Sequence, residues 1–334
     1  MKLLLSVKQL RSLIFIVSFT LVTTGFNLSP AYQTLNENQV NLDLFDMMTE
    51  ASGWVLLGQQ LFWTSDAGQT WTEIGPSIPA DASVEDILFI DSNRVWLLAT
   101  TPDPDGRALF QLSRTNDGGM SWGTLTLSLF ESGETASYAE KTEMGWFDSQ
   151  TGWISVKQSS GSNFSLGTLF KTSDGGSSWS RFPLPIADSI YFSDPYTGWA
   201  TGGPANDQIF KTQNGGATWK NVRPSDIPTG VQTVIYPPVN AGGQGVFVMT
   251  SEGAEDSLNV YTLQNSSDQW LRSDQVKMGV QPGMIGLSIL DVQNLVAVIP
   301  GTNSILRMSN GELVQLENVD GLSASIVELD MVSL

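Results

Sequence analysis

The chain has 334 residues, of which 16 are lysine or arginine and 34 are aspartate or glutamate, for a formal net charge of -18. A chain this acidic lacks the basic patch that nucleic acid or an anionic membrane surface needs, so nucleic acid is excluded as a partner. Cysteine and histidine are both absent, which excludes disulfides, a thiol nucleophile, an imidazole base and zinc sites of the Cys/His kind.

Residues 1–31 have the order of a secretory signal peptide. Basic residues precede an apolar run over 13–22, and small residues follow it. That run is too short to span a bilayer comfortably, which favours cleavage over an uncleaved anchor. Cleavage after Gly25 and cleavage after Ala31 both stay open. We therefore expect a secreted or periplasmic protein with an N-terminal linker over 32–40.

An eight-residue motif occurs four times after this leader. Its pattern is Thr-x-Asp/Asn-x-Gly-x-Ser/Thr-Trp, and the copies are TSDAGQTW, TNDGGMSW, TSDGGSSW and TQNGGATW. Four copies in one chain indicate an internal repeat rather than chance. The motif positions that we interpret as structural turn residues are Asp66, Gly68, Trp71, Asp117, Gly119, Trp122, Asp174, Gly176, Trp179, Asn214, Gly216 and Trp219.

The motif is typical of a β-hairpin turn. Gly176 is expected to adopt a backbone conformation that a Cβ resists, and the Asp174 carboxylate to accept bonds from N–H groups of its own turn. Trp179 supplies an apolar plate beside the loop. Because Asn214 accepts the same bonds without charge, bonding matters more than ionisation. A catalytic or calcium site needs one special copy rather than four equivalent ones, so a structural role is predicted.

Short apolar runs surround each copy in the same order. A Trp-led run and a second strand-like run precede the turn, an alternating segment follows the tryptophan, and a further apolar run lies upstream. No helical period is convincing, so the pattern predicts four short strands per unit. Such units are what a β-propeller needs, because one blade cannot bury both of its faces alone.

The predicted fold is all-β, a β-propeller of four-stranded antiparallel blades over 41–334. Six blades are preferred and seven are the alternative, because later copies of the motif fade and a run over 324–334 predicts an additional inner strand. That strand either closes the ring or begins a seventh blade. The expected repeat units are 41–75, 84–128, 140–185, 187–223, 229–273 and 283–317.

The repeats resemble the Asp-box, or bacterial neuraminidase repeat, of sialidase-like propellers. The pairing of Gly-Trp with the run Phe-Lys-Thr-x-Asp-Gly-Gly is closer to the photosystem II stability and assembly factor family, well over 41–222 and in outline over 229–320. This resemblance implies a lumenal or periplasmic propeller that binds a membrane-protein intermediate without chemistry. That family uses an arginine-lined patch, with which no arginine of this chain aligns.

For true sialidases, the resemblance implies an arginine triad, a Tyr-Glu nucleophile pair, an acid Asp and an arginine before Ile-Pro or Leu-Pro. The nearest string here is SRFP, whose Arg181 falls in an outer-strand position. We therefore expect a non-enzymatic, extracytoplasmic binding or assembly scaffold, monomeric and without a cofactor. A protein partner is expected, with a membrane protein complex or a glycan as candidates. The alternative is a sialidase-like carbohydrate-active or glycan-binding propeller.

Two further features leave alternatives open. Asp103 and Asp105 lie in an acidic loop, as do the carboxylates of 251–257. A solvated loop is favoured over a calcium site, because the other ligands of a hand-type loop are missing. Trp63 and Trp146 fall outside the repeat positions, and core packing is favoured over a role as surface anchors.

Overall fold

The computed structural model describes residues 44–49, 51–102, 108–127, 129–130, 139–158, 167–227, 233–241, 244–251, 257–264, 269–277, 286–291, 294–298, 305–309 and 312–316. Every regular element in these ranges is a β-strand, which confirms the predicted all-β class. No helix in the same ranges is long and apolar enough to cross a membrane. The signal peptide, linker and closing strand predicted over 1–31, 32–40 and 324–334 lie outside the described residues, as do Asp103 and Asp105.

The described strands form six antiparallel sheets, each from consecutive strands of the chain. The first three sheets contain β1 (Leu44–Met47), β2 (Gly53–Leu57), β3 (Gln60–Thr64), β4 (Thr72–Glu73); β5 (Ser83–Phe89), β6 (Val95–Pro102), β7 (Ala108–Thr115), β8 (Gly123–Leu127); and β9 (Ala139–Trp146), β10 (Gly152–Gln158), β11 (Gly167–Thr172), β12 (Ser180–Leu184).

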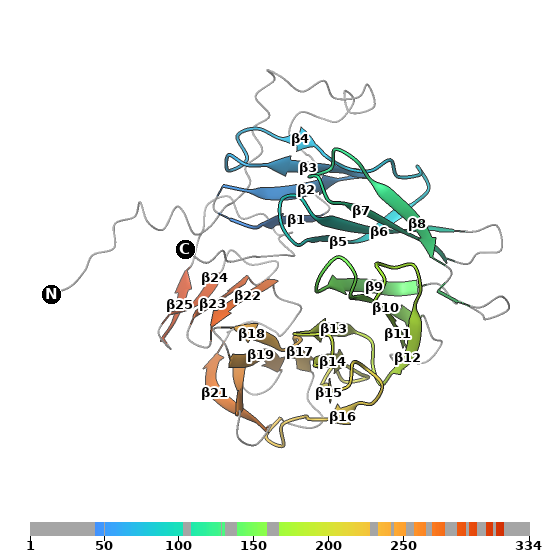
Figure 1. Ribbon diagram of the computed structural model, residues 1–334. Coiled ribbons are helices and arrows are strands. Elements are labelled where there is room, and N and C mark those ends of the chain that lie inside the picture. Colours follow the sequence, from blue (N-terminus) through green and yellow to red (C-terminus); the bar gives the residue numbers. More distant parts are fainter. Residues whose placement is uncertain are drawn as a thin grey trace.

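The other three sheets contain β13 (Ser189–Phe192), β14 (Gly198–Gly202), β15 (Gln208–Thr212), β16 (Lys220–Asn221); β17 (Thr233–Ile235), β18 (Val239–Ala241), β19 (Gln244–Ser251), β20 (Ser257–Gln264), β21 (Gln269–Lys277); and β22 (Gly286–Asp291), β23 (Asn294–Val298), β24 (Ile305–Ser309), β25 (Glu312–Leu316). In chain order, the sheets follow one another around the molecule (Figure 1).

Five of the six sheets have the predicted four antiparallel strands, and the fifth sheet has one more. Its β17 pairs only with 249–251, at one end of the long strand β19, and β18 pairs with 244–246 at the other end. The extra strand β18 therefore covers the end of β19 that the short strand β17 leaves unpaired. We call the first strand of each sheet its inner strand, since β9 lies directly beside β5 and β13 of its neighbours.

The core lies between successive sheets. Trp96 of β6 and Trp146 of β9 stack face to face, with ring centroids 3.7 Å apart, and Phe110 and Phe170 belong to the same cluster. The second strands, such as β10, have runs of consecutive buried residues, as expected of strands covered on both faces. The first five sheets therefore pack against one another in sequence, and Trp146, at 7% exposure, is a core residue.

Candidate binding site on the inner strands

The four copies of the motif form turns that follow β3, β7, β11 and β15, the third strand of each of the first four sheets. We call them the motif turns. In the turn after β11, the Thr172 hydroxyl donates to Asp174 Oδ1 at 2.8 Å and accepts the Gly176 N–H at 2.9 Å. Asp174 accepts the Ser178 N–H at 2.9 Å and the Ser178 hydroxyl at 2.6 Å. The same four bonds recur at Asp66 and Asp117.

These bonds account for the acidity of the motif carboxylates. The bond from the Ser178 hydroxyl, followed by those from its N–H and from Thr172, lowers the pKa of Asp174 to about 2. In the fourth turn, Asn214 Oδ1 accepts the Thr218 N–H at 2.9 Å, and its Nδ2 donates to the Thr218 hydroxyl at 2.8 Å. The same pairs of groups are therefore bonded without a charge. Asn214 donates to the Thr218 hydroxyl, whereas Asp174 accepts from the Ser178 hydroxyl.

The motif glycines allow left-handed backbone and close approach. Gly119 has a φ of 87°, and a Cβ there would overlap the carbonyl oxygen of Ile74 in the preceding sheet. Trp122 donates its ring N–H to that same carbonyl at 2.8 Å. Trp179 and Trp219 instead donate to the glycine carbonyl of their own turns. The structure thus places the twelve motif residues in four separate turns, one in each of the first four sheets, and does not bring them together into one site.

A cavity of about 610 Å³ lies along the inner strands β5, β9 and β13. The consecutive residues 140–147 of β9 and its end line this cavity. Since alternate side chains of a strand point to opposite faces, an unbroken run shows that the cavity follows the free edge of β9. Its acidic lining residues are Glu85, Asp86, Glu140 and Glu143, and its aromatic ones are Trp146, Phe147, Trp153, Tyr191 and Phe192.

Two of the glutamates occupy β-bulges. Leu98 pairs with Asp86 and Ala99 with Val84, which leaves Glu85 as the extra residue of β5. In β9, Glu140 is the extra residue in the same way. A bulge re-aims the side chain of its extra residue and is common beside functional sites. Glu85 accepts the Thr100 hydroxyl at 2.6 Å, so its position is set by the neighbouring strand.

The other two carboxylates join neighbouring sheets. Asp86 Oδ2 accepts the Met144 N–H at 2.8 Å, and Glu143 Oε2 accepts the Ile190 N–H at 2.9 Å. Asp86 and Glu143 each lie ten residues before the tryptophan that leads the second strand, Trp96 or Trp153. Sequence reasoning missed this pair, although the shared spacing from the Trp-led run was a signal that comparison of the repeats offered.

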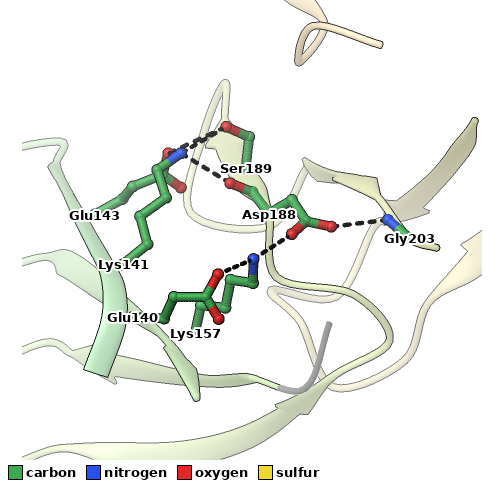
Figure 2. A network of polar contacts seen from close by, with 7 residues as sticks. All are labelled: Glu140, Lys141, Glu143, Lys157, Asp188, Ser189 and Gly203. Carbon is green, nitrogen blue, oxygen red and sulfur yellow. Dashed lines mark hydrogen bonds and ion pairs between the residues drawn. The ribbon is translucent and has the colours of Figure 1, made fainter. Parts of the chain in front are cut away.

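A network of charges joins the third and fourth sheets (Figure 2), and Glu140, Lys141 and Glu143 of this network also line the cavity. Lys157 Nζ lies 2.7 Å from both Glu140 and Asp188, and Asp188 accepts the Gly203 N–H at 2.8 Å. Lys141 pairs with Glu143 at 2.6 Å. Burial alone would lower the pKa of Lys157, but the bonds to Asp188 and Glu140 outweigh it and raise this pKa.

A second polar cluster lies away from the inner strands. The fully buried Tyr261 of β20 donates to Asp226 at 3.4 Å, and Arg272 of β21 lies 3.5 Å from the same carboxylate. Burial, followed by the charge of Asp226, raises the pKa of Tyr261 to about 12. The described inner strands contain no arginine, and Arg181 lies on the fourth strand β12. Within the described ranges, no group of three or more acidic residues is arranged to hold a metal ion.

Sheets of four antiparallel strands that pack face to face around the molecule define a β-propeller. No protein-family model and no curated protein matches the chain, but solved structures do. YCF48 from Cyanidioschyzon merolae superposes with a TM-score of 0.55 at 16% identity, over 85% of this chain and 86% of that one. YCF48 bound to D1 peptide superposes with a TM-score of 0.55 at 14% identity, over 84% of this chain and 83% of that one.

A glycoside hydrolase is also similar in fold. The GH74 enzyme of Niastella koreensis superposes with a TM-score of 0.53 at 14% identity, over 81% of this chain but only 44% of the enzyme. At these identities, the likeness to all three structures shows the propeller fold alone.

Proposed function

We propose that this chain is a non-enzymatic, extracytoplasmic propeller of six blades that binds a protein partner and serves as an assembly scaffold. The proposal follows the resemblance of its repeats to the photosystem II stability and assembly factor family. The N-terminal segment over 1–31, with its basic residues and short apolar run, is the reason for an extracytoplasmic location. The six described sheets are the reason for six blades.

The observation that carries the proposal is the extent of the superposition on YCF48. The alignment spans 84% of this chain and 83% of the YCF48 chain in the structure that contains D1 peptide. A superposition over most of both chains gives this chain the fold of a protein that was solved with a bound peptide, which supports the proposal of a protein partner. The cavity on the inner strands supplies a place where such a partner would contact this chain.

Catalysis by a sialidase-like or other carbohydrate-active propeller is the alternative, and the chemistry of the described carboxylates weighs against it. Asp86 and Glu143 accept hydrogen bonds from backbone N–H groups of neighbouring sheets, which is a structural role. Tyr261 is fully buried and lies away from the inner strands, and its raised pKa makes the phenolate harder to form than that of an ordinary tyrosine. The match to the GH74 enzyme covers less than half of that enzyme.

The test is crosslinking and co-purification of the tagged mature protein from its native cell envelope, read by mass spectrometry. We expect stoichiometric recovery of one membrane protein complex. Recovery of nothing above background, or glycosidase turnover that is lost in Glu85→Gln, would contradict the proposal. Protease accessibility of the tag in cells stripped of their outer layer tests the location separately, since an internal protein would be protected.

A further inference from the structure

We propose that the cavity on the inner strands captures a lysine or arginine side chain from an extended segment of the partner protein. This inference rests on the proposed function and names the chemistry of the partner. The cavity follows the free edge of β9 and is bounded by β5 and β13. The cavity volume of about 610 Å³ is within the usual range of pockets that bind small molecules. The cavity therefore has room for a long side chain.

The charge of the wall favours a cation. Four carboxylates line the cavity, and Lys141 is the one cationic residue among the described lining residues. Lys141 is itself paired with Glu143 and donates to the carbonyl of Asp188 at 2.8 Å. Lys157 also pairs with Glu140, but it shares its charge with Asp188. The four wall carboxylates and Asp188 therefore outnumber the two lysines, in a protein whose net charge is -18. Such a concave acidic wall attracts basic groups and raises their local concentration.

The apolar part of the wall suits the stem of the same side chain. Tyr191 and Phe147 are half-buried, and Trp153 lies against the backbone of Gly145, where a Cβ would meet its ring nitrogen at 2.5 Å. Gly145 holds the position at which β5 and β13 carry Leu88 and Tyr191, so the Trp153 ring occupies the space that a β9 side chain would fill there. Lysine and arginine bury their methylene stems against apolar surface and place the cation over aromatic rings.

The geometry favours capture of a side chain over addition of a strand. A free strand edge normally invites an extended peptide to pair with its backbone. Here the Met144 N–H, in the middle of β9, is already bonded to Asp86, so continuous pairing along this edge is blocked. Thr142 is among the residues that line the same wall, and its buried hydroxyl has no hydrogen-bond partner among the described residues.

The experiment measures binding of fluorescent short peptides to the full mature protein. The peptides are identical except for one central residue, which is lysine, arginine or norleucine, the last having the lysine stem without its charge. We expect saturable binding of the lysine and arginine peptides, weaker binding of the norleucine peptide, and a loss of affinity with added salt. Equal binding of all three peptides, or no saturable binding of any, overturns the proposal.

Variants then place the site. Glu85→Gln and Glu140→Gln each remove one charge from the wall, and we expect roughly fivefold weaker binding from each. Glu73→Gln is the matched control, because Glu73 is exposed on the outer strand β4, and it should bind as the parent does. Equal weakening in all three variants would show nonspecific charge attraction and would refute the site.

A photo-reactive lysine analogue in the peptide supplies a readout that does not depend on a variant folding. Its crosslinks should map to 140–147, and crosslinks only elsewhere refute the site. Failure of this inference differs from failure of the proposed function. If the Glu85→Gln and Glu140→Gln variants recover the envelope partner at the yield of the parent, the proposed role of the cavity is refuted but the proposed scaffold function is not. If the peptides bind but no envelope partner is recovered, the proposal for the cavity stands and the proposed scaffold function is refuted.

Discussion

The motif turns and the network around Lys157 lie at opposite ends of the third sheet. In β10, Gly152 pairs with Thr172 at the turn end, and Lys157 pairs with Lys141 at the other end. The bonds that the Thr and the Asp or Asn of each motif turn make lie within eight residues of sequence and are repeated in four sheets. The network joins Lys157 to Asp188 across two sheets. The repeated local hydrogen bonds stabilise the turns of the sheets. The contacts between residues far apart in sequence are not repeated, and they distinguish the surface near Lys157 from the rest of the propeller.

The largest effect is expected where a motif turn touches the neighbouring sheet. Gly119→Ala forces a Cβ onto the Ile74 carbonyl at a φ of 87°. We expect a loss of about 3 kcal/mol in the free energy of unfolding, from strain and overpacking together, measured by urea denaturation. Gly123→Ala is the control, because nothing lies within 4 Å of a Cβ there. Equal stability of the two variants would show that close approach is not what the glycine provides.

The network should be the next most sensitive region. Lys157→Met keeps an apolar stem but leaves Glu140 and Asp188 without their shared cation. Because the Lys157 side chain is only 18% exposed, we expect a loss of about 2 kcal/mol in the free energy of unfolding. Lys220→Met on the exposed strand β16 is the matched control and should be neutral. If both variants unfold at the parental urea concentration, the network contributes no stability.

A single motif hydroxyl should matter somewhat less. Thr172→Val removes the acceptor of the Gly176 N–H, which is buried. An unsatisfied buried donor costs about 1.5 kcal/mol, and the same urea assay detects it. Thr172→Ser retains the hydroxyl and should recover most of the loss. A valine variant as stable as the parent would show that this bond contributes nothing to the stability, and a loss in the serine variant alone would assign the effect to the methyl group that serine lacks.

The smallest effect at neutral pH is expected from removing the motif charge while keeping its bonds. Asp174→Asn reproduces the arrangement of Asn214, so the unfolding midpoint at pH 7 should stay close to that of the parent. Substantial destabilisation would show that ionisation matters more than bonding.

Lowering the pH should destabilise the motif turns that contain an aspartate more than the turn that contains Asn214. The folded pKa values of Asp117 and Asp174 are lowered from 3.8 to about 2. Lowered folded values mean that these carboxylates stabilise the fold above pH 3.8, and that their contribution is lost as the pH falls toward 2. We expect the double variant Asp117→Asn, Asp174→Asn to lose less stability than the parent over this interval, measured by urea midpoints. Parallel losses would contradict the assignment of the shifts to these bonds.

Much of the fold was predictable because its signals are local. The turn chemistry around Asp174 and the runs of apolar residues beside it act over a few residues, and they predicted sheets of four antiparallel strands. The fifth sheet differs from the predicted four strands by the extra strand β18. The difference in length between β17 and β19 leaves no signal in the local sequence from which this strand could be predicted. The repeat units as a domain division and the number of blades in the ring stay predictions.

By itself, the sequence determined the strand order, the motif turns and the acidic character of the chain. Only the tertiary structure decided which carboxylates meet. Asp86 reaches an N–H group 58 residues away and Glu143 one 47 residues away, and Glu85 and Glu140 face the cavity through bulges that depend on pairing with the next strand. Contacts between sheets depend on how the inner strands are placed side by side, and that placement is set by the packing of whole sheets rather than by any short stretch of residues.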